Sequence, residues 1–265
     1  MASTAFSGQA CGLAVAMPAI LALSLASIPS APAQMNAGPQ EDQRAKIILQ
    51  KSDEVRFPAQ GFEVSVTIQT SQHDKATESR EYKILSKGNE DTIVMVTSPA
   101  SERGQIMLMK GRDLWVFLPD VSQPVRLSLA QRLTGQVANG DIARANFSGD
   151  YAPRLAGTEK LGDEMYYLLD LAAVDRWVTY QRVRLWVGQD NYWPYKAEFY
   201  SLSGRLLKTC VYESFKQIAG RMRPTRLVMS DALHEDEQSI LDYTNMKLRD
   251  LPDKIFSKDY LKKLD

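Results

Sequence analysis

Alternation of apolar and polar residues dominates this chain and indicates β-strands. In the stretch 62–69 the even positions are apolar and the odd positions are polar, so one face of an extended chain can be buried while the other meets solvent. Similar runs, bounded by turn residues, continue almost to the end of the chain. We expect strands at 62–69, 80–86, 91–97, 106–109, 114–118, 125–129, 155–160, 165–171, 180–187, 194–200, 206–213, 222–229 and 238–248. Many short strands and few helices predict an antiparallel sheet that curls into a barrel or half-barrel.

Two apolar runs, 106–109 and 114–118, flank a polar tip at 110–113 and predict a β-hairpin. Gly111 in this tip can supply the positive φ that a tight turn needs. Both faces of both strands are apolar, so we expect this hairpin to be covered on both sides. Two interpretations stay open: a hairpin at the centre of an ordinary β core, or one whose inner face lines a cavity for an apolar ligand.

Helical spacing occurs mainly near the two ends of the chain. Apolar and small residues recur at three- and four-residue intervals in 41–55, which predicts a helix that packs on the following sheet. A short helix is expected in 251–261, anchored by Ile255, Phe256 and Leu261. The stretch 131–153 has three glycines and no clear period, and an irregular connection of this length is usually a lid or binding loop, otherwise disorder.

The first 33 residues resemble a secretory signal peptide. An apolar run at 12–28 is followed by Ala31-Pro32-Ala33, a small-x-small triplet that predicts cleavage after Ala33. No basic residue precedes the run, and an uncleaved membrane anchor is the alternative. Export with cleavage places residues 34–265 in the periplasm as a single domain. Cys210 would then be the one remaining cysteine, and its apolar surroundings favour a small buried residue over a nucleophile.

Composition and motifs argue against several functions. The 265 residues carry 32 basic and 32 acidic side chains, without the basic excess that a nucleic-acid binder normally shows. Two histidines and two cysteines show no metal-ligand spacing, and no Gly-x-Ser-x-Gly motif occurs. His73 and His234 lie in polar surroundings; the acidic run after His234 could hold a hard cation, although such runs are usually solvated turns. A glycosidase with paired carboxylates stays open, but we expect a protein that is not an enzyme and has no metal or cofactor.

Three segments together resemble the outer-membrane lipoprotein-sorting protein family, the family of the periplasmic carrier LolA. They are the hairpin 104–119 with the strand at 125–128, the stretch 193–212 that begins Trp-Pro-Tyr-Lys, and the stretch 251–261 that begins Leu-Pro-Asp-Lys-Ile-Phe. No single motif is specific, but their order and spacing cover nearly all of the chain that follows the signal peptide.

This resemblance implies an antiparallel half-closed β-barrel with a few helices that cover its concave face and enclose an apolar cavity. The implied function is a periplasmic carrier that binds the acyl chains of a lipid or acylated lipoprotein and shuttles them towards the outer membrane or to and from an exporter. An inner-membrane exporter or an outer-membrane acceptor would be its protein partner, and we expect a monomer. Residues 131–153 would be a lid. The alternative is an envelope-stress sensor or regulatory binding module with the same fold.

The residues that we expect to line the cavity lie on the first strand and on the central hairpin. Aromatic and methionine side chains suit an apolar pocket for a flexible ligand, although an ordinary core would use them as well. The predicted lining residues are Phe62, Val64, Val66, Ile68, Met107, Met109, Trp115 and Phe117.

Overall fold

A computed structural model describes residues 39–72, 76–88, 90–144, 146–234 and 236–261, all of which belong to one compact unit, Ala37–Asp265. The predicted signal peptide and His73 lie outside the described residues. No helix in the described ranges is long and apolar enough to cross a membrane.

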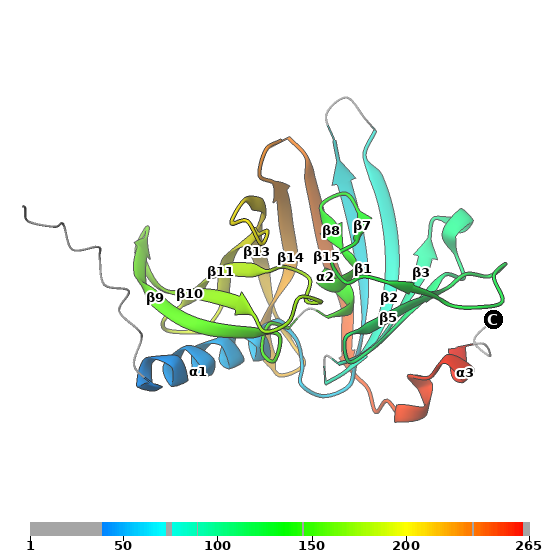
Figure 1. Ribbon diagram of the computed structural model, residues 1–265, viewed down its shortest axis with the longest axis horizontal. Coiled ribbons are helices and arrows are strands. Elements are labelled where there is room, and N and C mark those ends of the chain that lie inside the picture. The colour runs from blue at the N-terminus through cyan, green and yellow to red at the C-terminus, as the bar shows by residue number, and fades with distance from the viewer. Residues whose placement is uncertain (1–38, 73–75, 89, 145, 235, 262–265) are drawn as a thin grey trace, which may run out of the picture. The chain divides into compact units, whose positions relative to one another are not determined.

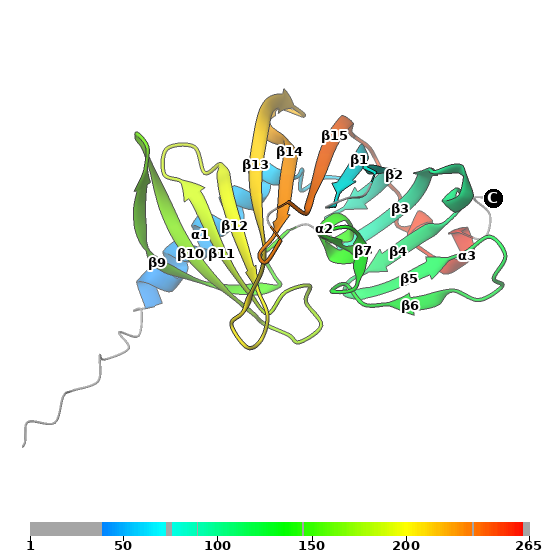
Figure 2. The ribbon, with the colours of Figure 1, turned by 90° about the horizontal axis from the view of Figure 1, so that it is seen from above.

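Thirteen strands form one antiparallel sheet in the order β6-β5-β4-β3-β2-β1-β15-β14-β13-β12-β11-β10-β9 (Figure 2). The strands are β1 Phe62–Ser71, β2 Glu78–Lys87, β3 Asp91–Ser98, β4 Ile106–Lys110, β5 Asp113–Phe117, β6 Val125–Leu127, β9 Tyr151–Leu161, β10 Glu164–Ala173, β11 Arg182–Gly188, β12 Pro194–Tyr200, β13 Leu206–Ile218, β14 Arg221–Asp231 and β15 Gln238–Leu248. The sheet stays open, with β6 and β9 as its edges. The predicted mainly β fold, an antiparallel sheet that does not close completely into a barrel, is therefore confirmed.

The sheet consists of two meanders that meet at its centre. Strands β1 to β6 follow one another towards one edge, and strands β15 back to β9 lead to the other edge. The first and the last strand pair with each other from Phe62↔Leu248 to Ser71↔Gln238. We call this pairing of β1 with β15 the seam.

The inner face of the sheet, defined by the even positions of β1, carries the main apolar core. Helix α1, Pro39–Arg56, begins and ends within two residues of its predicted bounds and runs across β9 to β14 (Figure 1). Its buried residues Ala45, Ile48 and Leu49 join the core of this face. At the C-terminal end of α1, Arg223 of β14 donates hydrogen bonds to the carbonyl oxygens of Glu54 and Val55, two acceptors that the helix itself cannot satisfy.

Residues 128–144 and 146–150, here called the covering segment, lie against the inner face and bury Leu129, Val137, Ala138, Ile142, Ala143 and Phe147 in its core. The segment contains β7 Arg132–Thr134, β8 Val137–Ala138 and α2 Asn139–Ala143. The sequence predicted an irregular stretch at 131–153. The prediction was wrong in part, because strands of two or three residues are set by contacts with the rest of the fold and leave no periodic pattern.

The outer face of the sheet is covered at β3 to β5 by residues 251–261. Residues 251–261 contain the 3-10 helix η2, Asp253–Ile255, and helix α3, Lys258–Leu261. The two helices pack their apolar residues on β3, β4 and β5. One remaining short element, η1 Ala100–Glu102, precedes β4. The β4–β5 hairpin is therefore covered on both faces, as its sequence predicted.

We predict that Phe256→Ala lowers the free energy of unfolding by about 3–5 kcal/mol, the usual cost of removing a buried phenyl ring. Phe256 is 1% exposed and anchors the C-terminal segment to the outer face. Denaturant unfolding followed by circular dichroism measures the change. Leu202→Ala, at an 86% exposed position, is the control and should change stability by less than about 0.5 kcal/mol. Equal effects of the two substitutions would contradict this packing.

Candidate functional site

An apolar pocket lies between the covering segment and the inner face of β2 to β6. Its volume is about 270 Å³, just below the range of about 300–1,000 Å³ that is usual for small-molecule sites. Its apolar walls are formed by Tyr82, Val96, Met107, Val116, Leu127 and Leu133. We call this cavity the inner pocket. It can hold part of a flexible apolar ligand, and a larger ligand requires the covering segment to move.

A charged pair completes the inner pocket. The Arg80 guanidinium donates to both carboxylate oxygens of Glu102, at 3.3 and 3.1 Å. Arg80 also donates to Thr134 Oγ1 of β7 at 2.8 Å, which fastens the covering segment to β2. The hydrogen bonds to Glu102, followed by one to Glu78, raise the pKa of Arg80 above its ordinary value. Arg80 is thus a permanent cation beside the apolar walls.

The structure divides the eight predicted lining residues between the two faces of the sheet. Six of them join the core of the inner face, namely Phe62, Val64, Val66, Ile68, Met107 and Met109. Trp115 and Phe117 lie on the outer face, where they pack against the C-terminal segment. Met107 alone of the eight lines the inner pocket.

The register of the β4–β5 hairpin explains this division. Met107 pairs with Val116, and Leu108 pairs with Trp115. Paired residues share a face, and successive residues alternate between faces, so Met107 and Trp115 cannot point the same way. In addition, the Lys258 ammonium lies 4.0 Å from the centroid of the Trp115 ring. We therefore replace Trp115 and Phe117 by Val116 as the inward residue of β5.

The covering segment is held to the sheet by a buried charged pair. Asp141 of α2 accepts a hydrogen bond from Lys208 Nζ of β13 at 2.7 Å, and both side chains are at most 7% exposed. Asp141 also accepts from the hydroxyl of Tyr180 at 2.8 Å and from the backbone N–H of Ala138 at 2.8 Å. Burial, followed by the neighbouring Asp141, raises the pKa of Tyr180 well above its ordinary value, so this hydroxyl stays a donor. Lys208 Nζ donates in addition to the carbonyl oxygen of Gln136.

A second polar contact joins the covering segment to α1. The carboxylate of Asp53 accepts from the backbone N–H of Phe147 at 3.1 Å and from that of Ser148 at 2.7 Å. Arg56 pairs with Asp53 at 3.1 Å, and its guanidinium carbon lies 4.1 Å from the centroid of the Phe147 ring. The end of the segment is thus fixed by charges within an otherwise apolar face.

A third contact places the covering segment on the seam. Ser239 Oγ of β15 accepts a hydrogen bond from the backbone N–H of Gln136 at 2.9 Å and lies 3.1 Å from Thr70 Oγ1 of β1. Gly135 has φ +49°, and a Cβ atom there would lie 2.3 Å from Ser239 Oγ and 2.5 Å from Thr70. Only glycine lets the backbone approach the seam this closely.

The other chemical candidates lie apart from the inner pocket. Asp231, His234 and Glu237 converge in the turn between β14 and β15, with ligand atoms within 4.8 Å of one another. The His234 side chain is 64% exposed, and Asp231 accepts from the backbone N–H groups of Leu233 and His234, as in an ordinary capped turn. Glu235 of the predicted acidic run lies outside the described residues. Cys210 is fully buried in the inner core.

The chain belongs to the LolA superfamily. It is 66% identical to a LolA superfamily protein from Nitrosomonas europaea of known structure; the match covers 82% of this chain and 98% of that one, with a TM-score of 0.79. A family model described as "Uncharacterized protein" matches residues 88–263. None of the curated proteins compared with the chain matches it.

Two more distant structures share the fold. A DUF1329 family protein from Desulfovibrio piger is 21% identical over 83% of this chain and 99% of its own, with a TM-score of 0.73. A protein described as an outer membrane lipoprotein-sorting protein domain, from Vibrio parahaemolyticus, is 19% identical over 83% and 99%, with a TM-score of 0.69. At these identities the likeness is one of architecture.

We predict that Lys208→Met loosens the covering segment, because it leaves the Asp141 carboxylate buried without its counter-charge. Hydrogen exchange should accelerate about tenfold or more for the backbone amides of residues 132–144, while amides of the seam keep their protection. Hydrogen exchange with mass spectrometry makes the measurement. Lys160→Met, at an exposed position on β9, is the control, and the double variant Asp141→Asn, Lys208→Met should exchange more slowly than Lys208→Met. Uniform acceleration over the whole sheet would contradict a local role.

We predict that Cys210 reacts with iodoacetamide only when the protein unfolds. Burial raises the pKa of its thiol to about 12, so at pH 8 the thiol is both protonated and shielded. Labelling at pH 8 with and without denaturant, in a Cys11→Ser background, tests this by mass spectrometry. Rapid labelling of the native protein would contradict the burial and reopen a nucleophilic role.

Proposed function

We propose that this protein is a periplasmic carrier that binds the acyl chains of a lipid or lipoprotein against the inner face of its sheet. The observation that carries the proposal is the inner pocket, where apolar side chains such as Met107, Val116 and Leu127 line a cavity beside the Arg80–Glu102 pair. Membership of the LolA superfamily supports it. Residues 34–265 would act as a single domain without chemistry or cofactor, after a signal peptide at 1–33 has been removed.

Burial of part of an acyl chain would offset the loss of one polar contact of the covering segment. Each methylene that is transferred from water contributes about 0.8 kcal/mol. Separating a buried ion pair such as Asp141–Lys208 costs about 3–5 kcal/mol. Burial of about four to six methylenes therefore offsets the loss of this contact. The segment also packs Val137, Ile142 and Phe147 in the inner core, so its full displacement would require a longer acyl chain.

The distribution of charge supports a segment that moves. The covering segment packs apolar residues such as Val137, Ile142 and Phe147 in the inner core, and a buried ion pair is often no more stabilising than apolar residues of the same volume. Here three polar contacts, at Asp141, Asp53 and Ser239, lie between the segment and the rest of the inner core. Groups of this kind can be satisfied by water or by a ligand when the segment is displaced.

The proposed direction of transfer is towards the outer membrane or to and from an exporter. A structural relative is described as an outer membrane lipoprotein-sorting protein domain, and this chain would play a comparable part. An inner-membrane exporter or an outer-membrane acceptor would then be the partner, with the carrier acting as a monomer.

We predict that Val116→Phe weakens the binding of a fluorescent C16 fatty acid about tenfold, because the added ring fills the inner pocket that Val116 lines. Val125→Phe is the matched control: Val125 pairs with Val116 on the edge strand β6 but is 47% exposed. Fluorescence titration gives both dissociation constants. Equal affinities of the two variants would show that the acyl chain of the fatty acid does not bind in the inner pocket.

Native mass spectrometry of the protein purified from the periplasm tests the proposal without a substitution. Added mass that extracts as acyl lipid supports the carrier and identifies its cargo. A ligand-free mass, together with no binding of the added fatty acid, would overturn the carrier and favour a regulatory binding module.

A further inference from the structure

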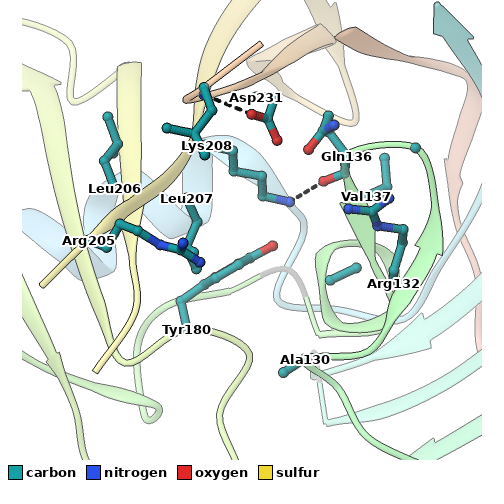
Figure 3. A pocket seen from close by; sticks show the side chains of 13 residues that line it. Ala130, Arg132, Gln136, Val137, Tyr180, Arg205, Leu206, Leu207, Lys208 and Asp231 are labelled. Carbon is teal, nitrogen blue, oxygen red and sulfur yellow. Dashed lines mark hydrogen bonds between the residues drawn. The ribbon is translucent and has the colours of Figure 1, made fainter. Parts of the chain in front are cut away.

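A second pocket of about 270 Å³ lies on the opposite side of the β7–β8 hairpin from the inner pocket. Its walls come from the covering segment, from the start of β13 and from the loop before β11 (Figure 3). It is lined by three cationic side chains, Arg132, Arg205 and Lys208, and by the hydroxyl-bearing Tyr180, whereas the inner pocket has two cations, Arg80 and Arg132. We call it the cationic pocket.

Two of these cations have no partner among the described residues. The guanidinium groups of Arg132 and Arg205 make no ion pair or side-chain hydrogen bond there, whereas Lys208 is already engaged by Asp141. In Figure 3 they approach the cavity from opposite sides, with the Lys208 ammonium and the Tyr180 hydroxyl between them. Two free guanidinium groups that face one cavity suit an anion with several oxygen atoms.

The carboxylates nearby leave this positive charge in place. Asp231 also lines the pocket, but its Oδ1 accepts from the backbone N–H groups of Leu233 at 2.8 Å and His234 at 3.1 Å. Asp141, behind Lys208, is occupied by that ammonium and by Tyr180. Apart from the Lys208–Asp141 pair, the lining of the cationic pocket thus carries two guanidinium charges and the single carboxylate of Asp231.

The cationic pocket and the inner pocket adjoin each other at one residue. Arg132 lines both cavities, and the β7–β8 hairpin separates them. The inner pocket offers apolar walls on β2 to β6, and the cationic pocket offers two guanidinium groups without a partner, so together they match an amphiphile that has an acyl chain and an anionic head. Leu206 and Leu207 also line the cationic pocket, so its wall is apolar where it is not charged.

We propose that the cationic pocket binds the phosphate-bearing headgroup of an anionic glycerolipid whose acyl chain occupies the inner pocket. This inference rests on the proposed carrier function and narrows its cargo. Arg205 and Arg132 would contact the phosphate oxygens, and Tyr180 and Lys208 would form the floor of the site. Movement of the covering segment would open both cavities together, because the segment walls each of them.

Calorimetric titration with two short-chain lipids below their micelle concentrations tests the inference. Dioctanoyl phosphatidylglycerol is anionic, and dioctanoyl phosphatidylcholine has the same chains with no net charge. We expect the protein to prefer the anionic lipid by about fivefold or more at 50 mM salt, and this preference to shrink at 500 mM salt as screening increases. Arg205→Glu should reduce the ratio of the affinities for the anionic and the uncharged lipid to about one. Arg205→Lys should retain most of the preference for the anionic lipid.

Lys216→Glu is the matched control, because it makes the same change of charge at an exposed position towards the other end of β13. It should leave the preference unchanged; an equal loss in this variant would overturn the site. Equal binding of both lipids by the unaltered protein would overturn the headgroup site and leave the carrier standing. Binding of neither lipid would overturn the carrier as well. Titration with glycerol 1-phosphate and with inorganic phosphate distinguishes a lipid headgroup from a free phosphate compound as the ligand. If either compound binds as tightly as the anionic lipid, a lipid headgroup is not the ligand.

Discussion

The pairing of the first strand with the last is the constraint on which the structure depends. Thr70 of β1 and Ser239 of β15 are 169 positions apart, yet their hydroxyl oxygens lie 3.1 Å from each other. Without this seam, the two meanders would be separate sheets, and β1 and β15 would become exposed edges in addition to β6 and β9. A contact over this distance in sequence has a high entropic cost of closure, so the seam is expected to form late in folding. Once it forms, it creates one continuous inner face.

The seam also determines where the covering segment can lie. Gln136 donates its backbone N–H to Ser239, and the missing side chain of Gly135 allows that approach. From this point the segment spreads over both meanders: Arg80 of β2 holds Thr134, and Lys208 of β13 holds Asp141. The segment is therefore attached to both halves of the sheet and to α1. A ligand that enters the inner core beneath the covering segment must therefore break contacts of this segment with both meanders.

The sequence was sufficient for the sheet because alternation is a local property. The strand at 238–248 and the strand at 194–200 have the bounds that were predicted, and α1 differs by two residues at most. Both faces of the strand at 106–109 are apolar, which correctly predicted that each face is covered. The cover on the outer face is the C-terminal segment, whose apolar residues were recognisable in advance.

The site was less predictable because it depends on register and on tertiary contacts. Trp115 and Phe117 were grouped with Met107 on residue type, whereas the pairing of Met107 with Val116 reverses that choice. The covering segment gave no periodic signal, since its two strands are two and three residues long. Asp141 and Lys208 are 67 positions apart, and nothing in either neighbourhood marks them as partners. Gly135 is apparent in the sequence, but the reason for a glycine there is its close approach to the seam, which the sequence does not show.

The two pockets follow from one physical arrangement. A polar segment laid across an apolar face must satisfy its own backbone and charged groups, so cations and carboxylates are brought to a surface that would otherwise bury only hydrocarbon. On the side of β2 to β6 the apolar face and the Arg80–Glu102 pair border the inner pocket. On the side of β13 the groups that hold the segment leave unpaired guanidinium charge at the cationic pocket. Arg132 belongs to both cavities, so the contacts that close the protein also place opposite chemistries side by side. That juxtaposition suits an amphiphile better than a purely apolar ligand, because an apolar ligand would leave these charges without a partner.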